Sequence, residues 1–530
     1  MSTTLIFNGL RRIPQVTTTY AAPTPNLITV PKSGHPSNPS QPPPGTGSLG
    51  QNLAVLGLVL YSALAPHSIA GAETALAITT IGWLIRTFAI RSLGLRRTKL
   101  DLPIWIFGLL TVASSLLSEE PAISIRKLQA ACVFFLFYIT QAIVTRRTAV
   151  FLVCVMLASG IAGTLYSTFD LVRGRGVLVN AIRADSPLRQ VHVEAGDAIW
   201  RINGKRVYST ADVDTALKAS PPGSKITVSL ISRGEQVERP GVTINEELRQ
   251  QSSPSGITGG GRVHRFRASG WTRHYETFSE ILQILALLAL GLALAHFRNH
   301  GPKLKFRLAM AASAILALGI VFTAKRTSLV ALLIGSVVIL LRATRGKARL
   351  VAAAALGLVL VAGAFFVWQT RAENALALGD ASASLRLTVA KVGLSRILVH
   401  PVFGHGMDAM HKHWNEWGFP GDQMIGLHST PLQLAFDRGL PALLCWLWLM
   451  FLFWTTTLRA EKDFRDLSDT NRYGLMLGAT GAIASFLASS MVNYNFGDGE
   501  VALVFWWLMG IVVVLSRREE SAPISNLDES

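Results

Sequence analysis

Long apolar runs alternate with short polar loops over most of the chain. These runs are found near residues 51–66, 70–90, 102–118, 128–144, 149–170, 277–297, 306–323, 327–342, 349–369, 433–457, 473–492 and 499–516. A helix of roughly 20 apolar residues crosses the hydrocarbon core of a bilayer. The pattern therefore predicts an α-helical polytopic membrane protein with about 12 transmembrane helices.

The polar stretches between the runs predict how the chain is organised. The first part is rich in Pro, Ser, Thr and Gly and has no charged segment leading into a short apolar one, which favours a flexible tail over a signal peptide. Long insertions are expected at 171–276 and 370–432. The predicted parts are a tail at 1–50, a bundle of five helices at 51–170, a small domain at 174–245, a second transmembrane domain at 262–516 and a tail at 517–530.

The short loops differ in charge, and this difference predicts an orientation. Loops on the side of the termini, counted with the start of the C-terminal tail, hold 20 Lys and Arg, and the short loops on the other side hold four. Lys and Arg prefer the cytoplasmic side of a membrane. We therefore expect both termini in the cytoplasm and both insertions in the periplasm of a bacterium, with the bundle in the inner membrane.

Composition supports a membrane protein over other basic proteins. The 530 residues include 50 Lys+Arg against 32 Asp+Glu, a net charge of +18, yet only 15% are charged and 50% are hydrophobic. A disordered polyelectrolyte has few apolar residues, and a soluble nucleic-acid binder of this basicity carries more charge. We therefore expect membrane lipids as partners and no nucleic acid.

The first insertion has the pattern of a small α+β domain. Residues 198–202 alternate between the two faces of a strand, and Asn203-Gly204 is typical of a type I′ hairpin turn. Ser209 can cap a helix whose apolar face includes Val213 and Leu217. Residues 226–230 form a second alternating strand.

This order resembles the PDZ domains of bacterial envelope proteases. The residues that carry the resemblance are Ser186-Pro187, Ala195-Gly196-Asp197-Ala198-Ile199, Ile202-Asn203-Gly204-Lys205 and Pro222-Gly223-Ser224. PDZ domains add a peptide strand to a sheet edge beside a helix. The resemblance implies a peptide site at Gly174, Gly176, Val177, Leu178, Val213 and Leu217, although Gly174-Arg175-Gly176 departs from the usual Gly-Leu-Gly-Phe. The domain either binds an envelope protein or docks against the bundle and shapes substrate access.

The second insertion and its flanks resemble the O-antigen ligase and polymerase superfamily. The matching pieces are Leu385-Arg386, the segment from Ile397 to Gly406, and Leu427-His428-Ser429-Thr430-Pro431-Leu432-Gln433-Leu434-Ala435-Phe436-Asp437-Arg438-Gly439. Arg267-Ala268-Ser269-Gly270 and Lys325-Arg326-Thr327-Ser328 resemble two further elements of the family, the second with only its arginine kept.

The resemblance implies transfer of a glycan from a polyprenyl diphosphate to an acceptor hydroxyl, without metal or cofactor. His428 would be the general base, because an imidazole titrates near neutral pH. Arg326 and Arg267 would be catalytic cations for the departing diphosphate, and Arg386, Arg273 and Asp437 would bind substrate. Three alternatives stay open: Arg326 anchors a helix end at the membrane surface, His428 caps the helix that follows, and the cluster of Arg262, Arg265, Arg267 and Arg273 binds anionic lipid headgroups or the glycan.

A metal site is not expected from the sequence. His400, His405, His411 and His413 share one loop, but no carboxylate or Cys accompanies them at a helical spacing. The three cysteines, Cys132, Cys154 and Cys445, all lie in apolar runs.

These observations together predict a membrane glycosyltransferase of the O-antigen ligase type. Its donor would be an undecaprenyl-diphosphate-linked glycan, and its acceptor another glycan, lipid A core or a protein. The alternatives are a polysaccharide polymerase of the same superfamily and a non-enzymatic PDZ-bearing scaffold or transporter.

Overall fold

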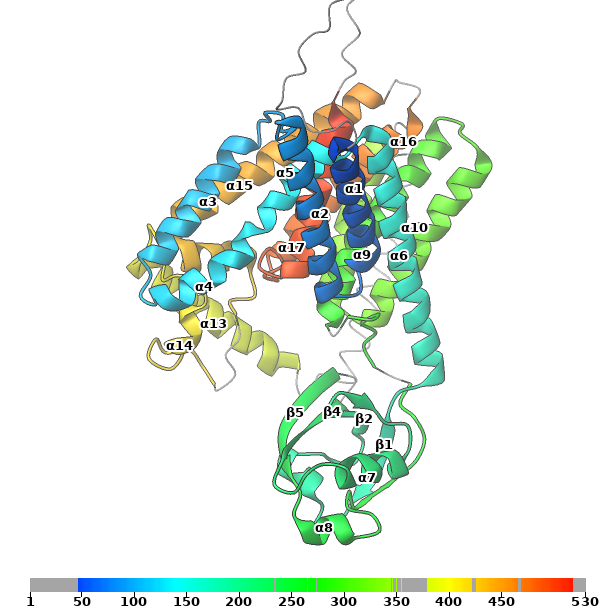
Figure 1. The fold of residues 1–530 in the computed structure, drawn as a ribbon, viewed down its shortest axis with the longest axis vertical. Coiled ribbons are helices and arrows are strands. Elements are labelled where there is room, and N and C mark those ends of the chain that lie inside the picture. The colour runs from blue at the N-terminus through cyan, green and yellow to red at the C-terminus, as the bar shows by residue number, and fades with distance from the viewer. Residues whose placement is uncertain are drawn as a thin grey trace, which may run out of the picture. The chain divides into compact units, whose positions relative to one another are not determined.

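The computed structural model describes residues 46–517 apart from 233–234, 265, 273, 345, 347–348, 350–353, 355–378, 422–425 and 466–468. In that part of the chain, ten helical segments are long and apolar enough to cross a membrane. They are α1 (Thr46–Leu64), α2 (Ile69–Ile90), α4 with η1 and α5 (Pro121–Ala131, Cys132–Phe134, Phe135–Ile143), α6 (Arg146–Arg173), α9 (Tyr275–Arg298), α10 (Lys303–Thr323), α11 (Arg326–Ala343), α15 (Thr430–Phe464), α16 (Thr470–Ser490) and α17 (Gly499–Ser516) (Figure 1).

The prediction of a helical multi-pass membrane protein is confirmed. The ten segments and the shorter apolar helix α3 (Asp101–Leu116) coincide with eleven of the predicted runs. Most of the remaining run, near 349–369, lies outside the described residues.

Three helices form the interior of the bundle. In α9, α16 and α17, 83% of the apolar window is buried, against 17–22% in α2, α10 and α11. Glycines bring α9 and α16 together: a Cβ added to Gly291 would lie 2.3 Å from the backbone nitrogen of Gly478. Small residues allow this close backbone approach between membrane helices. The outer helices therefore keep apolar side chains exposed, as lipid contact requires.

The first insertion folds as a predominantly antiparallel sheet with a helix. Its strands are β1 (Val177–Ile182), β2 (Ala198–Ile202), β3 (Lys205–Arg206), β4 (Lys225–Ser232), β5 (Glu235–Thr243) and β6 (Ile257–Gly259). The order is β5-β4-β2-β1-β6, with β3 paired to β2. The predicted turn is present, since Asn203 and Gly204 both have positive φ, 48° and 79°.

The helix of this domain forms as its sequence predicts. In α7 (Thr210–Lys218), the Ser209 hydroxyl accepts a hydrogen bond from the Asp212 amide, and the Asp212 carboxylate accepts one from the Ser209 amide. Val213 and Leu217 on this helix are fully buried in the domain's hydrophobic core. A 3-10 turn, η2 (Pro187–Val191), and the short α8 (Glu246–Gln250) complete the domain.

The second insertion consists of helices and loops that pack on the bundle. Helix α13 (Gly379–Val399) and the short α14 (Ala409–Lys412) precede α15. Trp414, Trp417 and Phe419 form a buried cluster that includes Ala435 and Phe436 of α15. The core of this insertion is therefore shared with a membrane helix.

Helix α15 is interrupted at Gly439, where φ is 82°. The loop after α13 satisfies the polar backbone at this break: the His405 amide donates to the Phe436 carbonyl at 2.8 Å, and the Gly406 amide donates to that of Asp437 at 2.9 Å. The Leu440 amide in turn donates to the Pro401 carbonyl at 2.7 Å. Backbone groups freed by a broken membrane helix need such partners.

Candidate active site

His428 lies two residues before α15 and is half-buried. Its backbone has a left-handed φ of 50°, an uncommon conformation for a residue other than glycine. The neighbouring residues fix this bend. As the N-cap of α15, the Ser429 hydroxyl accepts a hydrogen bond from the Leu432 amide, and the Leu427 amide donates one to Gln433 Oε1 at 2.9 Å. His428 is therefore held just before the helix. The N-cap is Ser429, so the alternative in which His428 caps the helix is wrong.

The start of α15 is tied to the loop between α16 and α17. The Thr430 hydroxyl donates to the Asn493 carbonyl at 3.0 Å and lies 2.9 Å from Asn495 Oδ1. Asn495 Nδ2 donates to the Ser489 hydroxyl at 2.8 Å. This network connects the His428 segment with the end of α16 and the loop that follows it.

A buried cation lies at the start of α11. Lys325 has 7% of its side chain exposed, and its ammonium is 3.0 Å from Glu280 Oε1 and 3.3 Å from Glu276 Oε2. Asn493 Nδ2 donates to the same Glu280 oxygen at 3.0 Å and to Thr327 Oγ1 at 3.2 Å. The neighbouring Arg326, which the sequence analysis favoured, is exposed.

Arg267 joins the same cluster through a tyrosine. Its guanidinium donates to the Tyr275 hydroxyl and lies 4.5 Å from the centre of that ring. The Tyr275 hydroxyl in turn donates to Glu276 Oε1 at 3.3 Å. Glu276 therefore links two of the cationic side chains, Arg267 and Lys325.

Electrostatic interactions connect His428 with this cluster. Burial lowers the pKa of His428, and the positive charges of Arg386 and Lys325 lower it further, while Glu276 acts in the opposite direction. Arg386 lies exposed on α13. A lowered pKa leaves the His428 imidazole neutral, with a free lone pair, at neutral pH. Arg273 lies outside the described residues.

Asp437 is buried on α15 and lies in the interior of the protein. Its carboxylate accepts from Gln433 Nε2 at 2.9 Å, and Gln433 is the side chain that also holds the Leu427 amide next to His428. Asp437 also lines a cavity of about 380 Å³ together with Asp408, Arg438, Tyr494 and ten other residues. Through Gln433, Asp437 therefore helps to hold the segment that carries His428.

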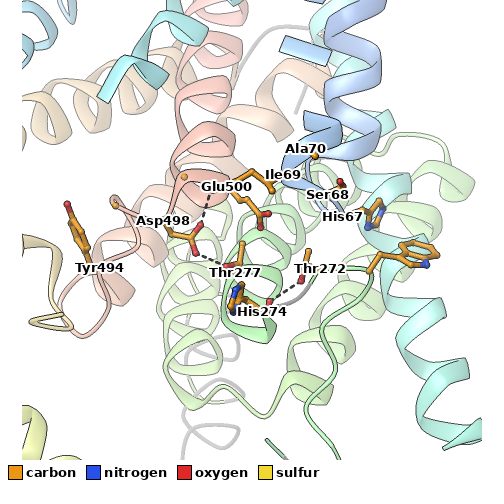
Figure 2. Close-up of a pocket in the computed structure, with 13 residues that line it drawn as sticks. His67, Ser68, Ile69, Ala70, Thr272, His274, Thr277, Tyr494, Asp498 and Glu500 are labelled. Atoms are coloured by element: carbon orange, nitrogen blue, oxygen red, sulfur yellow. Dashed lines mark hydrogen bonds between the residues drawn. The ribbon is translucent and has the colours of Figure 1, made fainter. Parts of the chain in front are cut away.

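A larger cavity, of about 710 Å³, shares the lining residue Tyr494 with the cavity that Asp437 lines. Figure 2 shows Thr277 of α9 and Asp498 joined across it, with the hydroxyl donating to Asp498 Oδ2 at 2.6 Å. His67 and Trp271 also line the cavity, and their rings contact each other edge to face with centroids 4.6 Å apart. Tyr494 lines both this cavity and the smaller one. The described lining of neither cavity includes His428.

Several residues of this region escaped the sequence analysis, namely Lys325, Glu276, Glu280, Asn493 and Asp498. One signal was available, since ionisable residues within apolar helices are rare and face a protein interior or a wet cavity. Glu276 and Glu280 are one helical turn apart at the start of an apolar run, but the sequence did not show which cation they face.

The predicted peptide site of the first insertion is already in contact with the chain itself. Gly174 and Gly176 have positive φ, and a Cβ added to Gly176 would lie 2.7 Å from the Ile199 carbonyl oxygen. Val177 and Leu178 pair with β2, while the following residues of β1 pair with β6 on the other edge. Strand β6 thus extends the sheet beyond the boundary expected at residue 245.

Comparisons with known proteins identify the two regions. Residues 311–447 match the family model described as O-antigen ligase, and residues 158–240 match that of the PDZ domain. The chain is 35% identical over 78 residues to the periplasmic serine endoprotease DegP of Escherichia coli, covering 15% of each chain. It is 32% identical over 83 residues to the serine protease Do-like HtrB of Bacillus subtilis, covering 16% of this chain and 17% of that protein.

These matches have limited extents, and each supports one region. The chain spans less than a quarter of the length of the curated relatives it matches. The O-antigen ligase match contains Lys325, Arg326, Arg386, His428 and Asp437, whereas Arg267 precedes it. The protein is thus a multi-pass membrane protein that carries an O-antigen ligase domain and a PDZ domain.

Proposed function

We propose that this protein transfers a saccharide from an undecaprenyl-diphosphate-linked donor to an acceptor hydroxyl at the periplasmic face of the inner membrane. The observation that carries the proposal is the meeting of His428 with cations from three separate segments. Arg267, Lys325 and Arg386 come from the residues before α9, the start of α11 and α13. Lys325 and Arg386 act electrostatically on His428. Arg267 is connected to Glu276 through the Tyr275 hydroxyl.

The cations supply what a diphosphate leaving group requires. The guanidinium groups of Arg267 and Arg386 offer forked donors for phosphate oxygens, and the ammonium of Lys325 is a compact positive charge. Lys325 pairs with Glu276, whose side chain is 49% exposed, and a diphosphate can replace such a solvent-accessible carboxylate. Positive groups already in place stabilise the charge that develops as the bond to the donor breaks.

His428 supplies the base. The acceptor oxygen attacks the anomeric carbon, its proton passes to the neutral imidazole, and the electron pair of the breaking carbon–oxygen bond leaves with the diphosphate. A base with a pKa below that of free histidine is unprotonated before the reaction, which matches the direction found for His428. The protein's own residues thus account for the proton and for the leaving charge.

The large cavity is our proposed place for a sugar unit. Its lining combines hydrogen-bonding groups, among them Thr277 and Asp498, with the indole ring of Trp271, one face of which is stacked on Tyr166. Trp271 is 48% exposed, and aromatic faces of this kind are suited to stacking on sugar rings. The two cavities are adjacent at Tyr494, which lines both, so we place the approach of the acceptor in the smaller cavity.

The proposal is tested by measuring glycan transfer from a purified undecaprenyl-diphosphate saccharide in membranes with matched protein levels. We expect His428→Ala to lower the rate by about 10²–10⁴-fold, the usual contribution of a general base. Lys391→Ala is the matched control, because Lys391 is exposed on α13, the same helix as Arg386. Transfer that is as fast in His428→Ala as in wild type would refute the proposal.

The acceptor distinguishes a ligase from a polymerase. Both reactions use the donor and the residues above, and they differ in whether the hydroxyl belongs to lipid A core or to a second donor-linked saccharide. Offering the two acceptors separately to the same membranes decides between them. A protein that transfers to neither, with a donor proven competent in another enzyme, would favour the non-enzymatic scaffold or transporter.

A further inference from the structure

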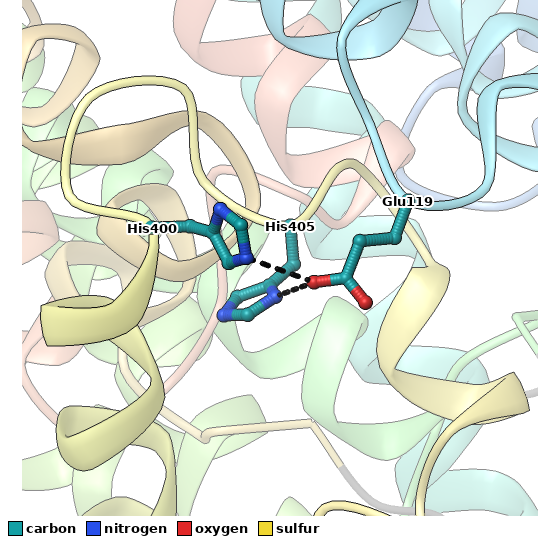
Figure 3. Close-up of side chains that lie close together, drawn as sticks. All are labelled: Glu119, His400 and His405. Atoms are coloured by element: carbon teal, nitrogen blue, oxygen red, sulfur yellow. Dashed lines mark hydrogen bonds and ion pairs between the residues drawn. The ribbon is translucent and has the colours of Figure 1, made fainter.

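Two histidines and a glutamate from distant parts of the chain converge where the second insertion meets the first half of the bundle. His400 and His405 lie in the loop after α13, and Glu119 lies in the turn between α3 and α4 (Figure 3). One potential ligand atom from each lies within 4.8 Å of the others. Glu119 is almost 300 residues away in sequence, so the spacing of the histidines gave no sign of it.

The hydrogen bonds of His405 fix how its ring is oriented. Its Nε2 is 3.0 Å from the Arg396 carbonyl oxygen, which can only accept, so Nε2 carries the proton. In the neutral ring Nδ1 then has a free lone pair, and it faces Glu119 Oε1 at 2.6 Å. Histidines that bind metals show this arrangement, with the second ring nitrogen donating to a backbone carbonyl.

Packing holds the ring in place. His405 has only 1% of its side chain exposed and lies 4.7 Å from the ring centres of both Trp417 and Phe436. His400 is 48% exposed, and its Nε2 is 3.4 Å from the same Glu119 oxygen. Two imidazoles and a carboxylate therefore point at one place that is buried on one side and open to solvent on the other.

We propose that Glu119, His400 and His405 bind a divalent transition-metal ion of the Zn²⁺ type. A single proton can bridge Glu119 to only one of the two imidazoles, whereas a divalent cation can bind Glu119, His400 and His405 at once. Zinc accepts two imidazoles and one carboxylate and leaves a fourth position for water. Ligand atoms about 2.0 Å from a tetrahedral zinc are about 3.3 Å apart, so the 2.6 Å contact needs to open by less than 1 Å.

The ion would fasten the second insertion to the bundle. The same two segments are already joined by the Ser118 hydroxyl, which donates to the His405 carbonyl at 2.9 Å, and by Lys127 with Asp408 at 2.9 Å. His405 is also the residue whose amide caps the break in α15. A metal here would stabilise the loop that precedes the His428 segment, and it takes no part in the transfer reaction proposed above.

The test uses the full-length protein in detergent, stripped with a chelator and titrated with Co²⁺ and Zn²⁺. We expect one equivalent of Co²⁺ to give a tetrahedral visible absorption, and Zn²⁺ to displace it and raise the Tm. Glu119→Gln and His400→Ala should bind at least tenfold more weakly, since each removes one ligand. His411→Ala is the matched control, a partly exposed histidine of the same loop outside the cluster.

Two results would overturn the metal site. Absence of bound metal in the wild type at micromolar concentration would mean that a protonated His405 pairs with Glu119 instead. Equal affinity in wild type and His400→Ala would place the ion elsewhere. Because His400 is exposed, its replacement is compatible with a folded protein, and the readouts are independent of transfer activity.

A separate observation concerns the peptide groove of the PDZ domain. Strand β6 pairs antiparallel with β1, with Val179 opposite Gly259, Ala181 opposite Thr258 and Ile182 opposite Ile257. Helix α7 lies alongside, since a Cβ added to Gly259 would lie 3.6 Å from Thr210 Cγ2 and 2.4 Å from the Leu178 carbonyl oxygen. A strand added to a sheet edge beside a helix is how PDZ domains hold peptides.

We infer that residues 257–261 are the PDZ domain's own ligand, so that another peptide must displace them. Pairing continues beyond β6, where the Leu178 amide donates to the Gly261 carbonyl at 3.4 Å and Arg175 pairs with Val263. The segment leads directly to Arg267. Displacement by an envelope protein would therefore act on a cation of the proposed active site, which is the one point where this inference rests on the proposed function.

Cysteine pairs test the occupied groove in the full-length protein. Ala181→Cys with Thr258→Cys places two exposed, directly opposed residues together, and we expect a disulfide upon mild oxidation in native membranes. Ala181→Cys with Thr243→Cys is the control, because Thr243 ends β5 on the other edge of the sheet. Absence of the first crosslink, or equal yields for both pairs, would show that the groove is free. This outcome does not depend on catalysis.

Discussion

The two long insertions build their interiors in different ways. The PDZ domain has a hydrophobic core of its own, in which Val213, Leu217 and Val228 are fully buried among residues of the same insertion. The core around Trp414 and Trp417 is completed by Ala435 and Phe436 of α15. An insertion with its own core can fold as a unit, whereas one that shares its core depends on the bundle. The second insertion should therefore couple its stability directly to the His428 segment, whereas the first reaches the proposed active site only through the segment that leads to Arg267.

The comparison is tested most strongly by removing one large core side chain from each insertion. Trp414→Ala should destabilise the protein by about 3–5 kcal/mol and Leu217→Ala by about 2–5 kcal/mol, the usual costs of such truncations. We expect transfer to fall much further with Trp414→Ala than with Leu217→Ala, because Leu217 can affect the proposed active site only through the segment that leads to Arg267. Thermal unfolding and limited proteolysis of the purified variants, with the transfer assay beside them, measure both effects. Equal loss of transfer would contradict the distinction.

Two glycines with a similar positive φ sharpen the comparison at the backbone. Gly439 and Gly204 have φ of 82° and 79°, but a Cβ on Gly439 would lie 2.0 Å from the Val402 carbonyl oxygen, whereas Gly204 has nothing within 4 Å. Gly439 has a ψ of 169°, a combination with positive φ that is essentially restricted to glycine, so Gly439→Ala combines backbone strain with a steric clash and should cost about 3 kcal/mol. Gly204→Ala meets only the strain, about 1 kcal/mol. The unfolding temperatures of the two variants check the difference. Similar values would mean that the loop containing Val402 moves away and relieves the clash.

The smallest expected effect is a change in the pH dependence of transfer. His428 must be neutral to act as a base, so the rate should be constant near neutral pH and fall below its pKa, which is lower than 6.5. Arg386→Ala removes a positive charge that lowers this pKa, so the fall should begin at a higher pH. A pH–rate profile of wild type, Arg386→Ala and Lys391→Ala tests this, with an unchanged profile expected only for Lys391→Ala.

The PDZ domain was predictable in detail because its structure depends on local signals. The turn at Asn203-Gly204, the capping box at Ser209 and the alternation in β2 and β4 each specify a conformation within a few residues. The strand β6 was missed, because its pairing with β1 joins segments about 75 residues apart and its glycines carry no strand signal.

The proposed active site was predictable only in part. The family resemblance singled out His428, Arg267, Arg326 and Arg386, and these roles stay predictions; the structure adds the buried Lys325 beside the exposed Arg326. A difference of one residue at a helix start reverses which side chain faces the interior, and the sequence does not fix that rotation. Glu276 and Asn493 are polar residues whose partners come from other helices.

The sequence by itself determined the membrane-spanning pattern and the small α+β insertion, because hydrophobic periodicity and turn chemistry act over short distances. Tertiary structure alone decided which ionisable groups meet. Lys325 is placed opposite Glu280, and Glu119 beside His405, by the packing of helices far apart in the chain. Charges in an apolar bundle are stable only where such partners are brought together, and no local pattern records the choice.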